Sequence, residues 1–187
     1  MRIHVGRGLT SAVLIAVGIA WAVATTAAQN GSRIQAGADV APVPLNMRGL
    51  NPALVREGSY IVNAQGGCND CHTAPPYAPG GDPFEGQTMV INTPCYLAGG
   101  VPFGPFVSRN LTRVPSLRTL AQFKEIMRKG TDFRTPADGT PILQVMPWPV
   151  YGQMSDRDLE AIYEYLRAIP VINPRPAFCT PPPPPMP

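Results

Sequence analysis

Apolar residues repeat at helical spacing in three stretches of the chain. The first predicted helix begins with Asn51 as its N-cap and Pro52 at the first helical position. Its apolar repeat continues to Val62, and the pair Gly66-Gly67 interrupts the pattern. We therefore predict a helix that starts at residue 52 and ends before these glycines.

The second and third predicted helices lie in the C-terminal half. The second spans residues 117–129, and Gly130 is expected to end it. The residues on its apolar face are Leu120, Phe123 and Met127. The third begins at Ser155, which forms an S-x-x-D cap with Asp158, and Pro170 ends it. Its apolar stripe consists of Leu159, Ile162, Tyr163 and Leu166.

Long segments without a period separate these helices. The 187 residues include 24 prolines and 18 glycines, and residues 73–115 are expected to be loop. Loops of this length bury little apolar surface, so we expect a large apolar cofactor to complete the core. A net charge of +3 with 14% charged residues argues against binding to nucleic acid.

The ends of the chain differ in composition from its middle. Residues 1–28 have a basic start, an apolar run over 9–24 and small residues at the end, the order of a secretory signal peptide. An uncleaved membrane anchor is the alternative. Residues 29–48 are predicted to be a linker, 49–170 one domain, and 171–187 a C-terminal extension with a proline-rich tail.

Directly after the first helix stands the sequence Cys68-Asn69-Asp70-Cys71-His72, a C-x-x-C-H motif typical of covalent haem c attachment. Two cysteines three residues apart on a helical turn face the same side, so both sulfurs can form thioethers with one haem. His72 then follows as the proximal iron ligand. The alternatives are a redox-active disulfide, a zinc site completed by the remaining two cysteines, and a chance match.

A methionine is the expected sixth ligand of this one haem. The only other histidine, His4, lies in the predicted signal peptide, which excludes bis-histidine ligation within one chain. Met146 lies in a proline-stiffened loop just before the last helix and is the leading candidate. Met154 is the nearest rival, and Met89 is not excluded.

With these motifs, the chain resembles the mono-haem class I c-type cytochromes that serve as electron-transfer partners of periplasmic dehydrogenases. The resemblance covers about residues 49–170. It rests on Gly58-Ser59-Tyr60, Cys68–His72, Ser108–Thr112, Met146–Pro149, Ser155–Leu159 and Tyr165-Leu166. It implies an all-α fold, with three to four short helices and long loops around one haem.

The resemblance also implies two details of the site. The first and last helices should cross near the haem edge, with Gly58 packed against Tyr163 or Leu166. Asn110 and Arg109 should lie near the haem propionates.

Two features depart from the compact family pattern. An extra glycine in Gly66-Gly67 changes how the first helix meets the haem motif. Cys95 and Cys179 are not needed by the haem. In an oxidising compartment we expect them to form a disulfide, and the alternative is two buried thiols.

The sequence therefore predicts a periplasmic electron carrier with a c-type haem held by Cys68 and Cys71 and ligated by His72 and Met146. It is expected to accept electrons from a periplasmic dehydrogenase, to pass them to a cytochrome or terminal oxidase, and not to be an enzyme itself. A haem sensor or gas-binding protein with a weak or open sixth position is the alternative. Catalysis at the iron is disfavoured because no distal acid–base group is evident.

Overall fold

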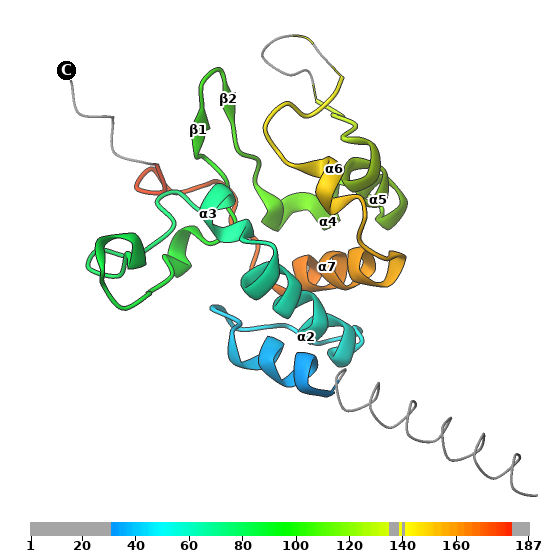
Figure 1. Cartoon of the computed structure of the whole chain (residues 1–187), viewed down its shortest axis with the longest axis horizontal. Coiled ribbons are helices and arrows are strands. Elements are labelled where there is room, and N and C mark those ends of the chain that lie inside the picture. The colour runs from blue at the N-terminus through cyan, green and yellow to red at the C-terminus, as the bar shows by residue number, and fades with distance from the viewer. Residues whose placement is uncertain (1–30, 135–138, 140, 181–187) are drawn as a thin grey trace, which may run out of the picture.

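The computed structural model describes residues 31–134, 139 and 141–180 (Figure 1). The predicted signal peptide and the proline-rich end of the tail, residues 181–187, lie outside this range. Within it the chain is mostly helical, with long loops and one pair of short strands. None of the helices described is both long and apolar enough to span a bilayer.

The first predicted helix is confirmed and extends further than a regular α-helix. Helix α2 spans Pro52–Tyr60, and the Asn51 side chain accepts hydrogen bonds from two N–H groups of its first turn. It continues as a π-helix, η1, over Ile61–Gln65, closed by a 2.7 Å bond from the N–H of Gly66 to the first carbonyl of η1. This π-helical segment ends at Gly66, two residues before the cysteine motif begins.

The second predicted helix is two helices. Helix α4 spans Val114–Leu117, and α5 spans Leu120–Lys129 and ends at the left-handed Gly130, as predicted. The predicted start, two residues before Thr119, was wrong. Thr119 and Gln122 form a capping box that starts α5 afresh, which the apolar period did not reveal.

The third predicted helix is confirmed, and a short helix precedes it. Helix α7 spans Asp156–Ala168, with a reciprocal capping box between Ser155 and Asp158. Helix α6 spans Trp148–Tyr151, within the segment expected to be a stiff loop. Pro149 lies in its first turn, where the missing N–H leaves no hydrogen bond unmade.

The segment 73–115 is largely loop, as predicted, but it contains a short hairpin. Strand β1 (Pro102–Phe103) pairs antiparallel with β2 (Phe106–Val107). The remaining ordered pieces are the 3-10 helices η2 (Pro83–Glu85), η3 (Thr93–Cys95) and η4 (Leu111–Arg113). The expected all-α class therefore holds apart from this hairpin.

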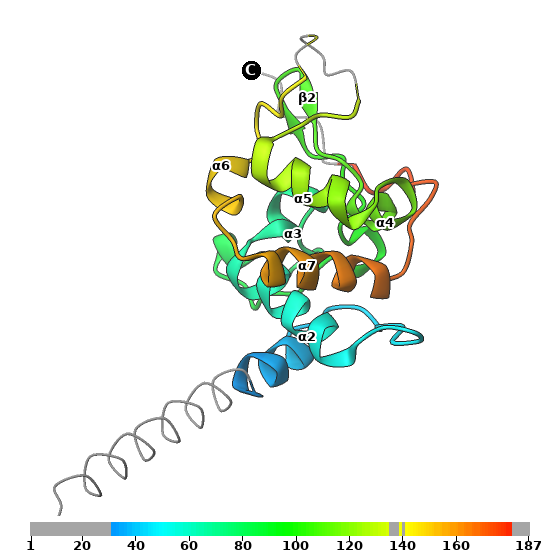
Figure 2. The ribbon, with the colours of Figure 1, turned by 90° about the vertical axis from the view of Figure 1, so that its right-hand side faces the viewer.

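The core lies where α2 crosses α7 (Figures 1 and 2). The crossing is close at Gly58, where a Cβ would come within 1.9 Å of the Ala161 carbonyl oxygen and 2.8 Å of the Tyr165 Cβ. The close approach was predicted, but the partners Tyr163 and Leu166 were wrong. Residues 161 and 165 lie one turn apart on the face toward α2, whereas the Tyr163 ring packs at a tilt against Phe123 of α5.

The predicted linker is partly ordered. Residues 31–39 form a helix that lies against α2 (Figure 2). Gly37 permits this contact, because a Cβ there would come within 1.8 Å of the Arg56 carbonyl oxygen. Farther along, the N–H of Asn46 donates to the carbonyl of Ala168 at the end of α7. The Arg33 guanidinium also lies over the Tyr60 ring of α2, so a glycine and a charged side chain make contacts that an apolar period does not reveal.

Candidate cofactor site

The cysteine motif forms a short helix of its own, α3, over Cys68–His72. Gly67 precedes it with φ +58°, a left-handed conformation that favours glycine. This conformation explains why a glycine stands at position 67. Cys68 is half-buried and Cys71 is exposed, and both are free thiols. The predicted attachment residues therefore lie on one helical turn, with the sulfurs unpaired.

His72 is fixed through both its backbone and its ring. Its Nδ1 lies 2.8 Å from the carbonyl oxygen of Arg109, so the ring donates a proton there. Its own carbonyl accepts a 2.7 Å bond from the N–H of Gly99. Burial lowers the pKa of His72, with the Arg109 carbonyl acting in the opposite direction. A neutral ring protonated at Nδ1 presents Nε2 as its free lone pair, the nitrogen a metal would take.

The two thiols are held in their protonated form. Burial, and then the neighbouring Cys71 thiol, raise the pKa of Cys68 to about 12. Burial and the Asp70 carboxylate raise the pKa of Cys71. Addition of a thiol across a vinyl group consumes both the sulfur and its proton, so neutral thiols supply all the atoms of that reaction.

A buried polar network fixes the π-turn that leads into α3. Tyr96 donates a hydrogen bond to the Asn63 side-chain oxygen, and its hydroxyl lies 2.9 Å from that of Tyr165. The Asn63 amide donates in turn to Tyr165 and to the Ser59 carbonyl. Burial raises the pKa of both tyrosines, which keeps the network neutral. It ties η1 to α7 and to the loop that follows η3.

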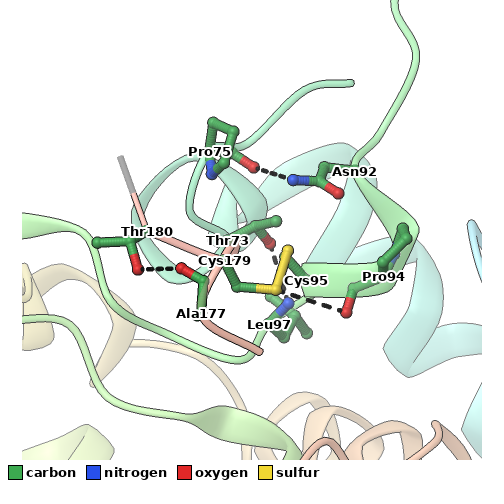
Figure 3. Close-up of a disulfide and its surroundings, with 9 residues drawn as sticks. All are labelled: Thr73, Pro75, Asn92, Pro94, Cys95, Leu97, Ala177, Cys179 and Thr180. Atoms are coloured by element: carbon green, nitrogen blue, oxygen red, sulfur yellow. Dashed lines mark hydrogen bonds between the residues drawn. A yellow bond between two sulfur atoms is a disulfide. The ribbon is translucent and has the colours of Figure 1, made fainter. Parts of the chain in front are cut away.

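That loop is anchored by the expected disulfide between Cys95 and Cys179 (Figure 3). The pairing removes both cysteines as ligands for a zinc site with the motif. A redox-active site of the thioredoxin kind is also disfavoured, because α3 follows a π-turn and not a strand.

The residues on either side of Cys95 also pack against the segment that follows α3 (Figure 3). The Leu97 N–H donates to the Thr73 hydroxyl, at 2.9 Å. The Asn92 amide donates to the Pro75 carbonyl, at 3.0 Å. The C-terminal segment is thereby coupled through Cys179 to the end of the motif helix.

The structure sorts the candidate methionines into three groups. Met127 is 5% exposed in the core, as expected of a packing residue, and Met89 is 61% exposed on a loop. Met146 and Met154 are both half-buried and pack against the same core as Cys68. The geometry therefore keeps both as candidate ligands.

The chain around Met146 is tied to the motif through α6. The hydroxyl of Tyr151, at the end of α6, donates a 2.7 Å bond to the carbonyl of Gly66. The Trp148 indole donates to the Leu143 carbonyl at 3.2 Å. These two bonds fix the segment on both sides of Met146 and join it to the turn before α3.

Asn110 and Arg109 have protein partners. The Asn110 side chain caps η4 through the N–H and hydroxyl of Thr112, and its amide donates to the carbonyl of Ile172 at 2.8 Å. The Arg109 guanidinium forms an ion pair with the buried carboxylate of Asp132. Sequence reasoning singled out the Arg109 side chain and missed its carbonyl, which carries no sequence signal.

These residues fit a covalently bound haem. Helix α3 carries two neighbouring thiols and an imidazole whose Nε2 is available. The thioethers of Met146 and Met154 pack against the same hydrophobic core as Cys68. Three apolar side chains that precede Met146 in the chain have exposed fractions near 40%; they are Phe133, Ile142 and Val145. Within the residues the structure describes, no three His, Cys, Asp or Glu side chains are grouped to hold a metal ion.

The chain is similar to cytochrome c subunits of dehydrogenases. It is 31% identical over 121 residues to the alcohol dehydrogenase (quinone) cytochrome c subunit of Gluconacetobacter polyoxogenes, a match covering 60% of this chain and 21% of that relative. It is 30% identical over 115 residues to the gluconate 2-dehydrogenase cytochrome c subunit of Pantoea cypripedii, covering 62% and 23%.

A third relative is the fructose dehydrogenase cytochrome subunit of Gluconobacter japonicus, 30% identical over 122 residues, or 60% of this chain and 20% of the relative. The chain thus spans about a fifth of the length of these relatives. No family model matches it, and no solved structure matches it.

Proposed function

We propose that this chain is an electron-transfer protein of the class I c-type cytochrome kind. It carries one covalently attached haem c, ligated by His72 and Met146, and is not itself an enzyme. The observation that carries the proposal is the α3 turn, where two unpaired thiols adjoin an imidazole whose Nδ1 proton is already donated to the Arg109 carbonyl. The similarity to cytochrome c subunits of dehydrogenases supports it.

The bound haem would supply a one-electron iron couple, and the chain's residues would hold it. Cys68 and Cys71 would hold it through thioethers to its two vinyl groups. The Arg109 carbonyl keeps the His72 ring in one orientation and one tautomer, so that Nε2 faces the iron. Met146 would supply a thioether as the second protein ligand, a ligand type that raises the reduction potential of a haem and would compete with exogenous ligands. Asn110 lies toward the propionates in this proposal.

The partners proposed are a periplasmic dehydrogenase as electron donor and a cytochrome or terminal oxidase as acceptor. The similar proteins are named as subunits of alcohol, gluconate and fructose dehydrogenases, which supports a dehydrogenase donor. We propose a periplasmic location, in keeping with the signal-like N-terminus and the Cys95–Cys179 disulfide, since such bonds persist in oxidising compartments.

The experiment that tests the proposal is a visible spectrum of the exported, haem-loaded protein. We expect one haem per chain to survive denaturation, as seen by intact mass. The dithionite-reduced spectrum should be unchanged by carbon monoxide. Absence of a covalent haem would refute the proposal, and rapid, complete carbon monoxide binding would refute a closed sixth position.

The sixth ligand is tested with a matched pair of variants. Met146→Leu and Met154→Leu each replace a half-buried thioether with an isosteric side chain that packs on the same core. We expect only Met146→Leu to bind carbon monoxide rapidly and to lose the methionine-ligated ferric spectrum. The reverse result would assign the iron to Met154.

A further inference from the structure

The ion pair of Arg109 with Asp132 joins the two sides of the candidate cofactor site. On one side, the Arg109 carbonyl orients His72 through a 2.8 Å bond. On the other, Asp132 belongs to the segment between α5 and α6 that leads to Met146. The two residues are 23 positions apart, so this contact is made by tertiary packing alone.

Asp132 is built rigidly into that segment. Its N–H donates to the Pro141 carbonyl, and the N–H of Leu143 donates to the Gly130 carbonyl at 2.8 Å. Thr131 and Ile142 pair as an antiparallel bridge between these bonds. Met146 follows this small ladder by only three residues, so displacement of Asp132 moves the base of the methionine loop.

The ion pair is also buried enough to matter energetically. The Asp132 side chain is 4% exposed and that of Arg109 is 32% exposed. Asp132 accepts a further bond, at 3.0 Å, from the N–H of Arg134. Exposed ion pairs contribute little, whereas removing one partner of a buried pair leaves the other charge without compensation.

We propose that Arg109 and Asp132 form a positioning clamp that holds the histidine and methionine ligands at a fixed separation. The inference rests on the proposed function, because it concerns ligands of the haem. At one end, the clamp fixes the Arg109 carbonyl, which accepts the hydrogen bond from His72. At the other end, it fixes Asp132, which is hydrogen-bonded to the chain just before Met146. Its loss weakens the bond from methionine to iron without removing either ligand.

The test compares carbon monoxide association with the ferrous, haem-loaded protein in matched variants. Asp132→Asn removes the buried charge and keeps the size of the side chain. Glu57→Gln is the control, since Glu57 is a 7% exposed carboxylate paired at 2.7 Å with Arg157, 62% exposed, at the α2–α7 crossing. Arg109→Lys keeps the charge but loses the forked donor geometry, and serves if Asp132→Asn does not fold.

We expect Asp132→Asn to bind carbon monoxide at least about tenfold faster than the parent, with Arg109→Lys between the two. Glu57→Gln should lose stability but keep the parent's rate. Equal rates in Asp132→Asn and Glu57→Gln would refute the clamp. A parent that lacks covalent haem, or that itself binds carbon monoxide freely, would instead refute the proposed function.

Discussion

The close crossing of α2 and α7 predicts a large effect for Gly58→Ala. The new Cβ would lie 1.9 Å from the Ala161 carbonyl oxygen, so the helices must separate by about 1.5 Å to restore an ordinary contact of about 3.4 Å. The obstacle is backbone, which cannot move aside like a flexible side chain. Separation also loosens fully buried neighbours such as Val55 and Leu159.

The magnitude follows from two opposing effects. Overpacking costs about 1–3 kcal/mol in ordinary cores, and this site lies at or above the upper end because the helices themselves must move. In the opposite direction, alanine stabilises a helix by about 1 kcal/mol relative to glycine, because its intrinsic helix propensity is higher. We therefore expect a net loss of about 2 kcal/mol or more, a large share of a total stability of about 5–15 kcal/mol.

The assay is guanidinium unfolding of the haem-loaded protein, followed by far-UV circular dichroism. With a slope of about 4 kcal/mol per molar, the midpoint should fall by about 0.5 M. Gly31→Ala is the matched control, because Gly31 is also helical and a Cβ there meets nothing within 4 Å. If the unfolding midpoints of both variants lie within about 0.1 M guanidinium of the parent's, the helix crossing tolerates a side chain at position 58 and the reasoning is refuted.

Three further predictions concern the periphery of the domain. Replacing Cys95 and Cys179 with serine should cost about 4.5 kcal/mol on the chain-entropy model for the 84-residue separation, measured by the same unfolding assay; a loss under about 1 kcal/mol would contradict it. Gly37→Ala should release the helix over residues 31–39 from α2, so that limited proteolysis cleaves near residue 40 faster than in the parent, and unchanged cleavage would argue against that packing. Asp156→Asn should destabilise the protein at neutral pH, because a hydrogen bond from Arg128 holds the Asp156 pKa below its usual 3.8. That stabilisation is present above pH 3.8 and is lost as pH falls through the lower folded-state pKa, so parent and variant stabilities should converge in acid.

Local signals in the sequence were sufficient for α2, α5 and α7, but not for α4, α6 or the helix over residues 31–39. The Asn51 and Ser155 caps are side-chain contacts within one turn, so their residue types alone predict them. The break between α4 and α5 was missed because the apolar period runs across it, and the Thr119 capping box has only ordinary residue types. The β1–β2 hairpin was missed because strands of two residues have no period to detect.

The sequence by itself determined the chemistry offered at the site. Two cysteines and a histidine at fixed spacing lie on one helical turn wherever that turn forms, because their separation is set by local geometry. It also limited the sixth ligand to a few methionines. It ranked Met146 above Met154 because prolines stiffen the loop around Met146, and the structure does not separate the two, since both pack on the same core.

Only the tertiary structure decided what orients these groups. The acceptor for His72 is a backbone carbonyl, which every residue has, so no residue type marks Arg109 for this role. The partner of its guanidinium, Asp132, is brought to it by the packing of distant segments. Spacing along the chain fixes contacts within one helical turn, whereas contacts between segments depend on how the whole core closes.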